Sequence, residues 1–168
     1  MGLDMYAYTI DARLVESEGQ TDVRINKIAR RAVGFIDLSE YDIKKLDHDG
    51  VHSYFKKRIE ADKKAAEEGW VNTDFWYWRK FNNLHGWMER LYTSKGGRSS
   101  FNCTTVRINA EDLDRLEQDA ATLRPVGGFF WGSTEEMNQQ DIDEVKSFIA
   151  RAREAIAAGK AVFYDSWW

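Results

Sequence analysis

Aromatic rings, two adjacent cations and a histidine are concentrated in residues 75–92, FWYWRKFNNLHGWMERLY. Apolar residues recur there at intervals of three and four, which predicts one helix over residues 74–93. On that helix four side chains share a stripe along the edge of the core: Trp78, Asn82, His85 and Glu89. Histidine exchanges a proton near neutral pH, and an amide or carboxylate one turn away can fix its tautomer. Since the adjacent Arg79 could hold an anion while Trp78 stacks on a ring, the stripe is a candidate site.

The remainder of this helix is expected to face the core. Four apolar residues fall together on the neighbouring stripe: Phe81, Leu84, Met88 and Leu91. The spacing of His85 and Glu89 then has a second interpretation, an ordinary contact between successive turns, with the tryptophans filling the core edge. The sequence leaves both interpretations open.

Two further aromatic segments could close such a site. The string GGFFWGST contains Phe130 and Trp131, and the chain ends in FYDSWW, which contains Trp167. The first string resembles a phosphate-binding loop only superficially, because Ser133 stands where the essential lysine belongs and bulky rings replace the small residues that let the backbone curl. A short strand over residues 126–131 explains the string better.

One segment gathers residue types that bind metals, DHDGVH, with Asp47, His48, Asp49 and His52. An EF-hand beginning there would need glycine at its sixth position and glutamate at its twelfth, where this chain has His52 and Arg58. We therefore expect no metal, and a turn in which Asp49 or Gly50 leads into the next helix.

Composition excludes several classes of protein. The 168 residues suit one domain, residues 1–168, and the net charge of −4 comes from interspersed charges, so we expect no binding to nucleic acid. No apolar run approaches the ~20 residues of a membrane span. The single cysteine, Cys103, forms no internal disulfide, and we expect a buried structural thiol in a cytoplasmic protein that lacks a signal peptide and a cofactor.

Strands and helices are predicted to alternate without a strict rhythm. Strands are expected at residues 5–10, 33–38, 102–108, 126–131 and 161–164, and helices at residues 51–68, 74–93, 110–116 and 142–156. An irregular hairpin is expected around ESEGQTD. Asn109 with Asp112, and Ser133 with Glu136, form capping boxes. These elements predict a single α+β domain, with a small mixed or antiparallel sheet packed by about four helices.

Several motifs occur together along nearly the whole chain: MGLDMY at the start, YWRK, Asn82 and HGW within residues 77–87, GFFWGSTE at residues 128–135, and the closing FYDSWW. In order and spacing they resemble a family of small uncharacterised proteins from bacteriophages, prophages and bacteria. The resemblance implies a phage-type accessory protein that acts inside a bacterial cell.

Three functions fit these residues. The first is non-enzymatic binding of a planar, anionic, nucleotide-like molecule by Trp78, Arg79, Asn82 and His85, closed by Phe130 or Trp131 and by Trp167. The second is a hydrolase or lyase that uses His85 as general acid or base, oriented by Glu89 or Asp4. The third is a module that binds and inhibits a host protein through exposed aromatic side chains.

Overall fold

The computed structural model describes residues 2–38, 40–124, 126–127, 132 and 136–168. Within these residues the chain forms an antiparallel sheet of strand order β2-β1-β4-β3: β1 (Asp4–Asp11), β2 (Val71–Arg79), β3 (Val106–Ile108) and β4 (Lys160–Trp167). The helices are η1 (Ala12–Val15, 3-10), α1 (Ile25–Ala32), α2 (Glu40–Lys44), α3 (His48–Glu67), α4 (Asn82–Ser94), α5 (Ala110–Asp119) and α6 (Gln139–Ala157). The predicted α+β class is confirmed, and the sheet is of the antiparallel kind.

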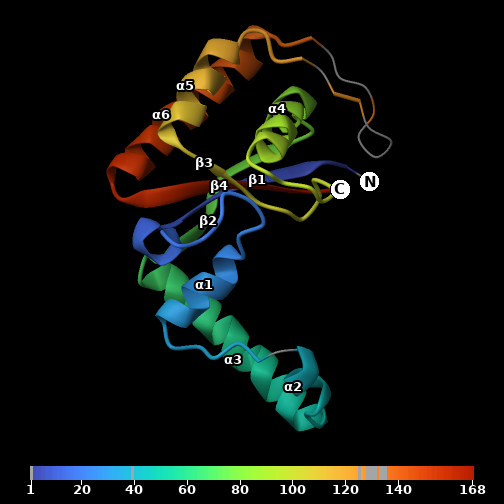
Figure 1. Ribbon diagram of the computed structural model, residues 1–168, viewed down its shortest axis with the longest axis vertical. Coiled ribbons are helices and arrows are strands. Elements are labelled where there is room, and N and C mark those ends of the chain that lie inside the picture. Colours follow the sequence, from blue (N-terminus) through green and yellow to red (C-terminus); the bar gives the residue numbers. More distant parts are fainter. Residues whose placement is uncertain (1, 39, 125, 128–131, 133–135) are drawn as a thin grey trace.

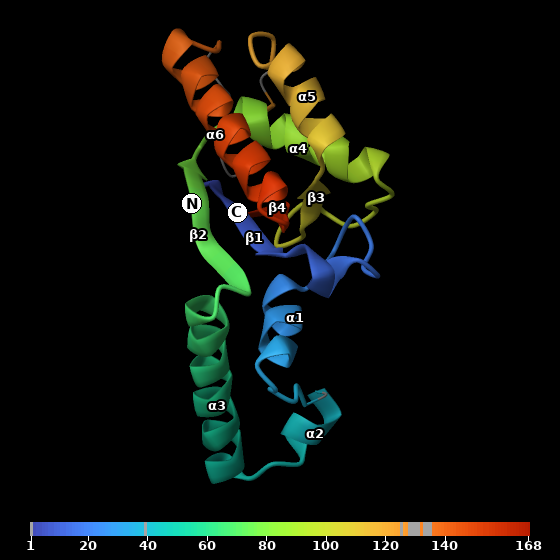
Figure 2. The ribbon, with the colours of Figure 1, turned by 90° about the vertical axis from the view of Figure 1, so that its left-hand side faces the viewer.

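Helices cover both faces of the sheet. Figure 1 shows α4, α5 and α6 on one side, and α1 and α3 on the other, with α2 at the far end. Strand β4 is therefore buried on both faces. Val162 and Tyr164 belong to one apolar cluster, and Ala161 and Phe163 belong to the other. Helices α1 to α3 reach well beyond the sheet, and we call residues 24–67, from the N-cap of α1 to the end of α3, the arm (Figure 2).

The single helix expected over residues 74–93 is wrong in its first half. Strand β2 pairs with β1 from Ile10 opposite Val71 to Asp4 opposite Arg79. Lys80 then takes a positive φ of 57°, and α4 begins at Asn82. Consecutive aromatic residues favour a strand, and β1 needs a partner on its free edge, so pairing overrides the helical spacing.

The arm contains a helix that sequence reasoning missed. Helix α1 buries Ile25, Ile28 and Ala29 against the sheet, in a segment that directly follows the expected hairpin and for which no helix was predicted. The strand expected over residues 33–38 is also wrong, since this segment has no regular structure and Ile36 is 81% exposed. A short apolar run without a pairing partner does not form a strand.

Local signals at helix ends were mostly reliable. Helices α3 and α6 cover the predicted segments, and the capping box of Asn109 with Asp112 opens α5. Helix α6, however, begins at a capping box of Asn138 with Asp141. Ser133 of the other predicted capping box, and most of the strand expected over residues 126–131, lie outside the described residues.

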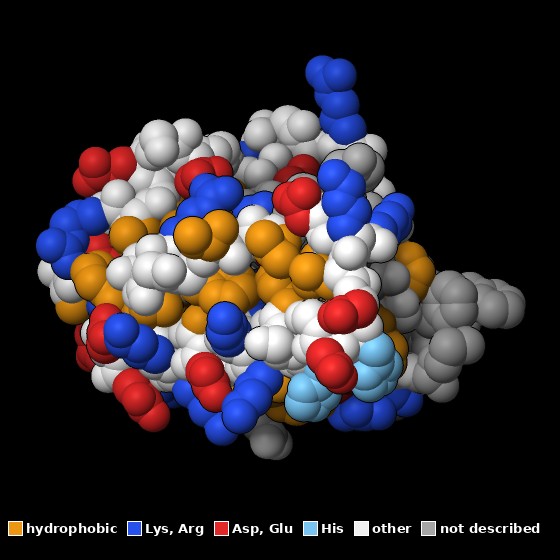
Figure 3. Space-filling view, turned by 90° about the horizontal axis from the view of Figure 1, so that it is seen from below, with side chains coloured by type: hydrophobic (Ala, Val, Ile, Leu, Met, Phe, Trp, Pro, Cys, Tyr) orange, Lys and Arg blue, Asp and Glu red, His pale blue; other side chains and the backbone are white. Residues whose placement is uncertain are grey.

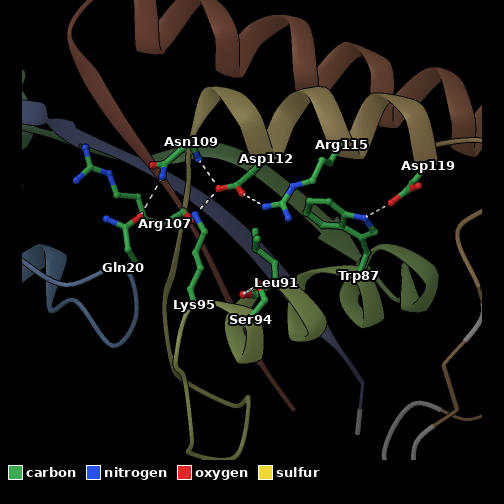
Figure 4. Close-up of polar contacts among 10 residues, drawn as sticks. All are labelled: Gln20, Trp87, Leu91, Ser94, Lys95, Arg107, Asn109, Asp112, Arg115 and Asp119. Carbon is green, nitrogen blue, oxygen red and sulfur yellow. Dashed lines mark hydrogen bonds and ion pairs between the residues drawn. The ribbon is translucent and has the colours of Figure 1, made fainter.

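A buried polar network holds α5 against the rest of the body (Figure 4). The carboxylate of Asp112 accepts hydrogen bonds from the backbone N–H of Asn109, from Lys95 and from Arg115. Close by, Trp87 donates its indole N–H to Asp119 at 2.9 Å. Burial lowers the pKa of Lys95, although Asp112 opposes the shift. The network therefore joins the end of α4 to the start of α5.

The arm carries exposed apolar side chains. Phe55 and Ile59 lie one turn apart on α3 and are 46% and 55% exposed. Figure 3 looks at this end of the molecule from below and shows hydrophobic side chains across its middle, with Lys and Arg side chains beside them. Among the described helices, none has the length and apolar character needed to cross a membrane.

Candidate functional site

Three of the four residues of the predicted stripe lie in the interior of the body. Trp78 and Asn82 are each 3% exposed and His85 is 1% exposed. Trp78 comes from β2 and packs its ring edge-on against Phe148 at 4.8 Å, so it shares no helix stripe with the other two. None of these three residues lines the cleft beside α1 and α3 that is described below. The expectation that they form an open site is wrong, because tertiary packing buries them.

The surroundings of His85 are those of a structural histidine. Its Nδ1 lies 2.9 Å from the hydroxyl of Tyr164, and its ring stacks on Phe101. Burial lowers the pKa of His85 to about 4. Glu89, one turn away, is exposed, so it does not accompany His85 into the core. An imidazole that is neutral and closed to solvent does not serve as an acid or base for a substrate.

Three other residues that were assigned to a site from the sequence lie on the opposite face of the sheet. Arg79, Asp4 and Trp167 occupy one row across β2, β1 and β4. Asp4 accepts hydrogen bonds from Arg79 at 2.8 Å and from Tyr77 at 2.5 Å, so it does not orient His85. Trp167 is 61% exposed. Phe130 and Trp131 lie outside the described residues. The sheet itself therefore separates the predicted ligand-binding residues into two groups.

The DHDGVH segment forms the start of α3. Asp47 is the N-cap residue and accepts the backbone N–H of Gly50 at 2.8 Å, in place of the expected turn at Asp49. The side chains of His48 and Asp49 are 96% and 100% exposed. Over the described residues, no group of three or more His, Cys, Asp or Glu side chains is arranged to hold a metal ion.

One cleft, which we call the arm cleft, lies between the arm and the uncovered part of the sheet. Its volume is about 800 Å³, within the ~300–1,000 Å³ typical of sites for small molecules. One wall comes from α1 and α3, the other from residues 99–105, and the floor includes Tyr8 of β1 and Asp165 of β4. Sequence segments separated by more than a hundred residues thus share one concave surface.

Four cations line the wall that the arm contributes, and two of them are already neutralised. Lys27 pairs with Asp37 at 2.7 Å, and Arg30 forms two hydrogen bonds with Asp62, at 2.5 and 3.0 Å. Neither Arg24 nor Arg58 takes part in an ion pair within the described part of the chain. These two guanidinium groups are therefore available to an anion, each with donors in the planar arrangement that suits a phosphate or carboxylate.

Backbone hydrogen bonds hold the two walls and the floor in place. The backbone N–H of Asp22 donates to the carbonyl of Thr105 at 2.9 Å, and the hydroxyl of Thr105 donates to the carbonyl of Val23 at the same distance. On the far side, the N–H of Cys103 donates to the carbonyl of Ser166 at 2.7 Å. Arg24 directly follows Val23, and Asp165 directly precedes Ser166, and these hydrogen bonds fix both neighbours. The cleft is therefore preorganised.

The floor of the arm cleft combines an aromatic ring with a carboxylate. Tyr8 stacks on Tyr6 with 6.1 Å between ring centres, and Tyr6 lies opposite Asp165 in the sheet. Burial raises the pKa of Asp165 to about 6, although the N–H of Ser166 donates to its Oδ1 at 2.6 Å. Among the described residues no cation forms an ion pair with Asp165. A half-buried carboxylate without a counter-ion in a cleft is typical of a functional group.

Cys103 lies at the mouth of this cleft, and the expectation of a buried thiol is wrong. The strand predicted over residues 102–108 begins only at Val106, and Cys103 is exposed in the preceding loop with a φ of 56°. Partial burial and the nearby Asp165 raise the pKa of the thiol, so it is largely protonated at neutral pH.

We expect Cys103 to react with 5,5′-dithiobis(2-nitrobenzoic acid) in the folded protein, releasing one equivalent of chromophore per chain at pH 8. The reaction is expected to be slower than that of free cysteine, because a raised pKa lowers the thiolate fraction. Removing the nearby negative charge with Asp165→Asn accelerates it. A thiol that reacts only after addition of denaturant would contradict the exposed position.

Sequence reasoning missed all four cations of the arm cleft. Arg24, Lys27 and Arg30 recur every three residues beside the apolar positions of α1, which is the signal of an amphipathic helix. No element was predicted over this segment. For Asp165 the only signal was a charged residue in an otherwise aromatic terminal strand.

These observations define an α+β protein with an open, polar cleft between its sheet and a helical arm. Comparison of the chain with protein-family models, curated proteins and solved structures found no match. The function must therefore be argued from the cleft itself.

Proposed function

We propose that the protein is a non-enzymatic binding protein that holds a planar, anionic, nucleotide-like molecule in the arm cleft. The observation that carries this proposal is the position of Arg24 and Arg58, two guanidinium groups without an ion pair among the described residues, on one wall of a cleft of about 800 Å³. The ligand class is the one expected from the sequence, but the site is different. The protein keeps the predicted role of an accessory protein inside a bacterial cell.

The chemistry of the cleft supports binding more than catalysis. Its described lining contains no histidine, its one thiol has a raised pKa, and Tyr8 has a pKa raised above its usual value by burial. These groups are poor nucleophiles at neutral pH. The ring of Tyr8 and the guanidinium groups instead suit a ligand with a flat apolar part and a negative charge.

The proposal predicts that removing the two free cations weakens binding. With Arg24→Ala and Arg58→Ala combined, we expect the Kd for ribonucleoside monophosphates to rise at least about tenfold, because charge-assisted hydrogen bonds contribute about 1.5–3 kcal/mol each. The measurement is isothermal titration calorimetry with AMP, GMP, CMP, UMP and inorganic phosphate at low salt.

The matched control is Arg31→Ala, which removes a cation from α1 that does not line the arm cleft. It is expected to leave the Kd within about twofold, since a charge outside the cleft acts only through the screened long-range field. Binding that survives the double variant unchanged, or no binding of any of these probes to the wild-type protein, would overturn the proposal.

A further inference from the structure

The unpaired positive and negative side chains of the arm cleft lie on different parts of its lining. The two free guanidinium groups, Arg24 and Arg58, lie on the arm, whereas the carboxylate of Asp165 lies on the sheet. The other two carboxylates of the lining are engaged, because Asp37 accepts from Lys27 and Tyr54, and Asp22 accepts from Tyr92. An anionic ligand alone would pair with the guanidinium groups of the arm and leave Asp165 with no donor besides the backbone N–H of Ser166.

Asp165 is suited to accept a pair of donors. An ionised carboxylate has two oxygens with about four lone-pair positions, and among the described residues the only hydrogen-bond donor to Asp165 is the backbone N–H of Ser166. Both oxygens can therefore accept further hydrogen bonds from the cleft side. Two parallel N–H donors match a carboxylate best, because each oxygen then takes one bond.

We propose that the ligand of this cleft carries, on the flat ring opposite its anionic group, two adjacent N–H donors that bind the carboxylate of Asp165, as the edge of guanine does. This inference rests on the proposed function, because it adds a ring specificity to the same site. The ring stacks on Tyr8, and its phosphate binds Arg24 and Arg58. Adenine presents an acceptor beside its amino group, so it places a lone pair against one oxygen of an ionised Asp165.

The protonation state of Asp165 then controls the preference for guanine over adenine. Its neighbours in the sheet are Tyr6 and Tyr8, and Cys103 faces it from the loop. All three have raised pKa values and stay neutral between pH 5 and pH 7.5. The charged groups of the remaining lining are Asp22, Arg24, Lys27, Arg30, Asp37 and Arg58. Asp165, with a pKa of about 6, is therefore the group whose charge changes in this range.

The test compares GMP, IMP and AMP by calorimetry at pH 7.5. IMP keeps the ring N–H of GMP but lacks its amino group, so we expect GMP to bind about 10- to 100-fold more tightly than IMP, the effect of one charge-assisted hydrogen bond. AMP is expected to bind more weakly still. At pH 5 a protonated Asp165 can donate to adenine, so the ratio of the AMP and GMP dissociation constants moves toward unity. The phosphate of each nucleotide also titrates near pH 6, but it is common to both and cancels in the ratio.

The matched variants are Asp165→Asn and Asp22→Asn. The first is expected to reduce the GMP-to-IMP preference to within about twofold, and the second, which also lines the cleft, to leave it unchanged. If the three nucleotides bind equally well to the wild-type protein, and binding still depends on Arg24 and Arg58, the base specificity is overturned and the proposed function stands. If none of them binds, both proposals are overturned.

Discussion

Replacing Asp112 by alanine is expected to destabilise the protein by about 3–5 kcal/mol, the usual effect of removing one partner of a buried ion pair. Asp112 is 2% exposed, and its carboxylate accepts from Lys95, Arg115 and the backbone of Asn109 (Figure 4). The variant would leave the Lys95 ammonium, with its side chain only 12% exposed, without its counter-charge, and would open the capping box of α5. Since folded domains are stable by about 5–15 kcal/mol, this is a large fraction of the total.

The measurement is urea unfolding followed by tryptophan fluorescence, with Asp114→Ala as the matched control. Asp114 lies on the same helix and pairs with Arg153 at 2.6 Å, but its side chain is 61% exposed, so we expect a loss of about 0–1 kcal/mol. Adding Lys95→Met to Asp112→Ala should restore part of the lost stability, because no buried ammonium is then left unpaired. Equal losses for Asp112→Ala and Asp114→Ala would show that burial of the network has no energetic consequence.

The second large effect is a pH dependence that two residues on opposite sides of β4 produce with opposite signs. His85, which contacts Tyr164, has its pKa lowered from 6.5 to about 4 by burial, so the unfolded chain binds a proton more readily. Its contribution makes the free energy of unfolding rise with pH from about 4 to 6.5. Asp165 has its pKa raised from 3.8 to about 6, so the stability that its protonated form provides below pH 4 is lost as pH rises through 6.

Each shift corresponds to roughly 3 kcal/mol at 1.36 kcal/mol per pKa unit, so in the wild-type protein the two contributions nearly cancel between pH 4 and pH 6. Single variants should reveal each contribution to the free energy of unfolding separately. Asp165→Asn leaves the His85 contribution, and stability relative to wild type is expected to rise by about 3 kcal/mol over this interval. His85→Gln leaves the Asp165 contribution, and relative stability is expected to fall by a similar amount.

Urea unfolding at half-unit steps of pH measures both profiles. Expressing each as a difference from wild type removes the contributions of other carboxylates, such as Asp11, whose pKa the Arg13 side chain lowers to about 2. Asp49→Asn, at a side chain that is 100% exposed, is the control and should run parallel to wild type. A profile of Asp165→Asn that also runs parallel would mean that Asp165 titrates equally in the folded and unfolded chains.

Local sequence was a good guide wherever an element is stabilised by its own residues. Helix α6 repeats apolar residues at helical spacing and ends at Ala157, two residues before Gly159, which takes the positive φ of 79° that favours glycine. The capping box of α5 is local as well, since Asn109 and Asp112 are three residues apart. Such signals need no knowledge of the remaining chain.

The predictions of secondary structure are wrong where the conformation of a segment depends on pairing with a distant part of the chain. Residues 75–79 satisfy both helical and strand patterns because nearly every residue is aromatic, and pairing with β1 decides between them. The same pairing places Trp78 in the core and Arg79 on the opposite face, because neighbouring residues of a strand point to opposite sides. Because these residues form a strand and not the predicted helix, the residues of the predicted site lie on opposite faces of the sheet.

The sequence alone determined the α+β class, the two long helices, the cap of α5 and the first strand, because each follows from residues close together in the chain. Only the tertiary structure decided that His85 is buried against Tyr164 and that Arg24, Arg58 and Asp165 share one cleft. These residues are up to 141 positions apart, and no local pattern connects them. Their convergence depends on β4 pairing with β1, and on α1 being held to α3 by Arg30 and Asp62.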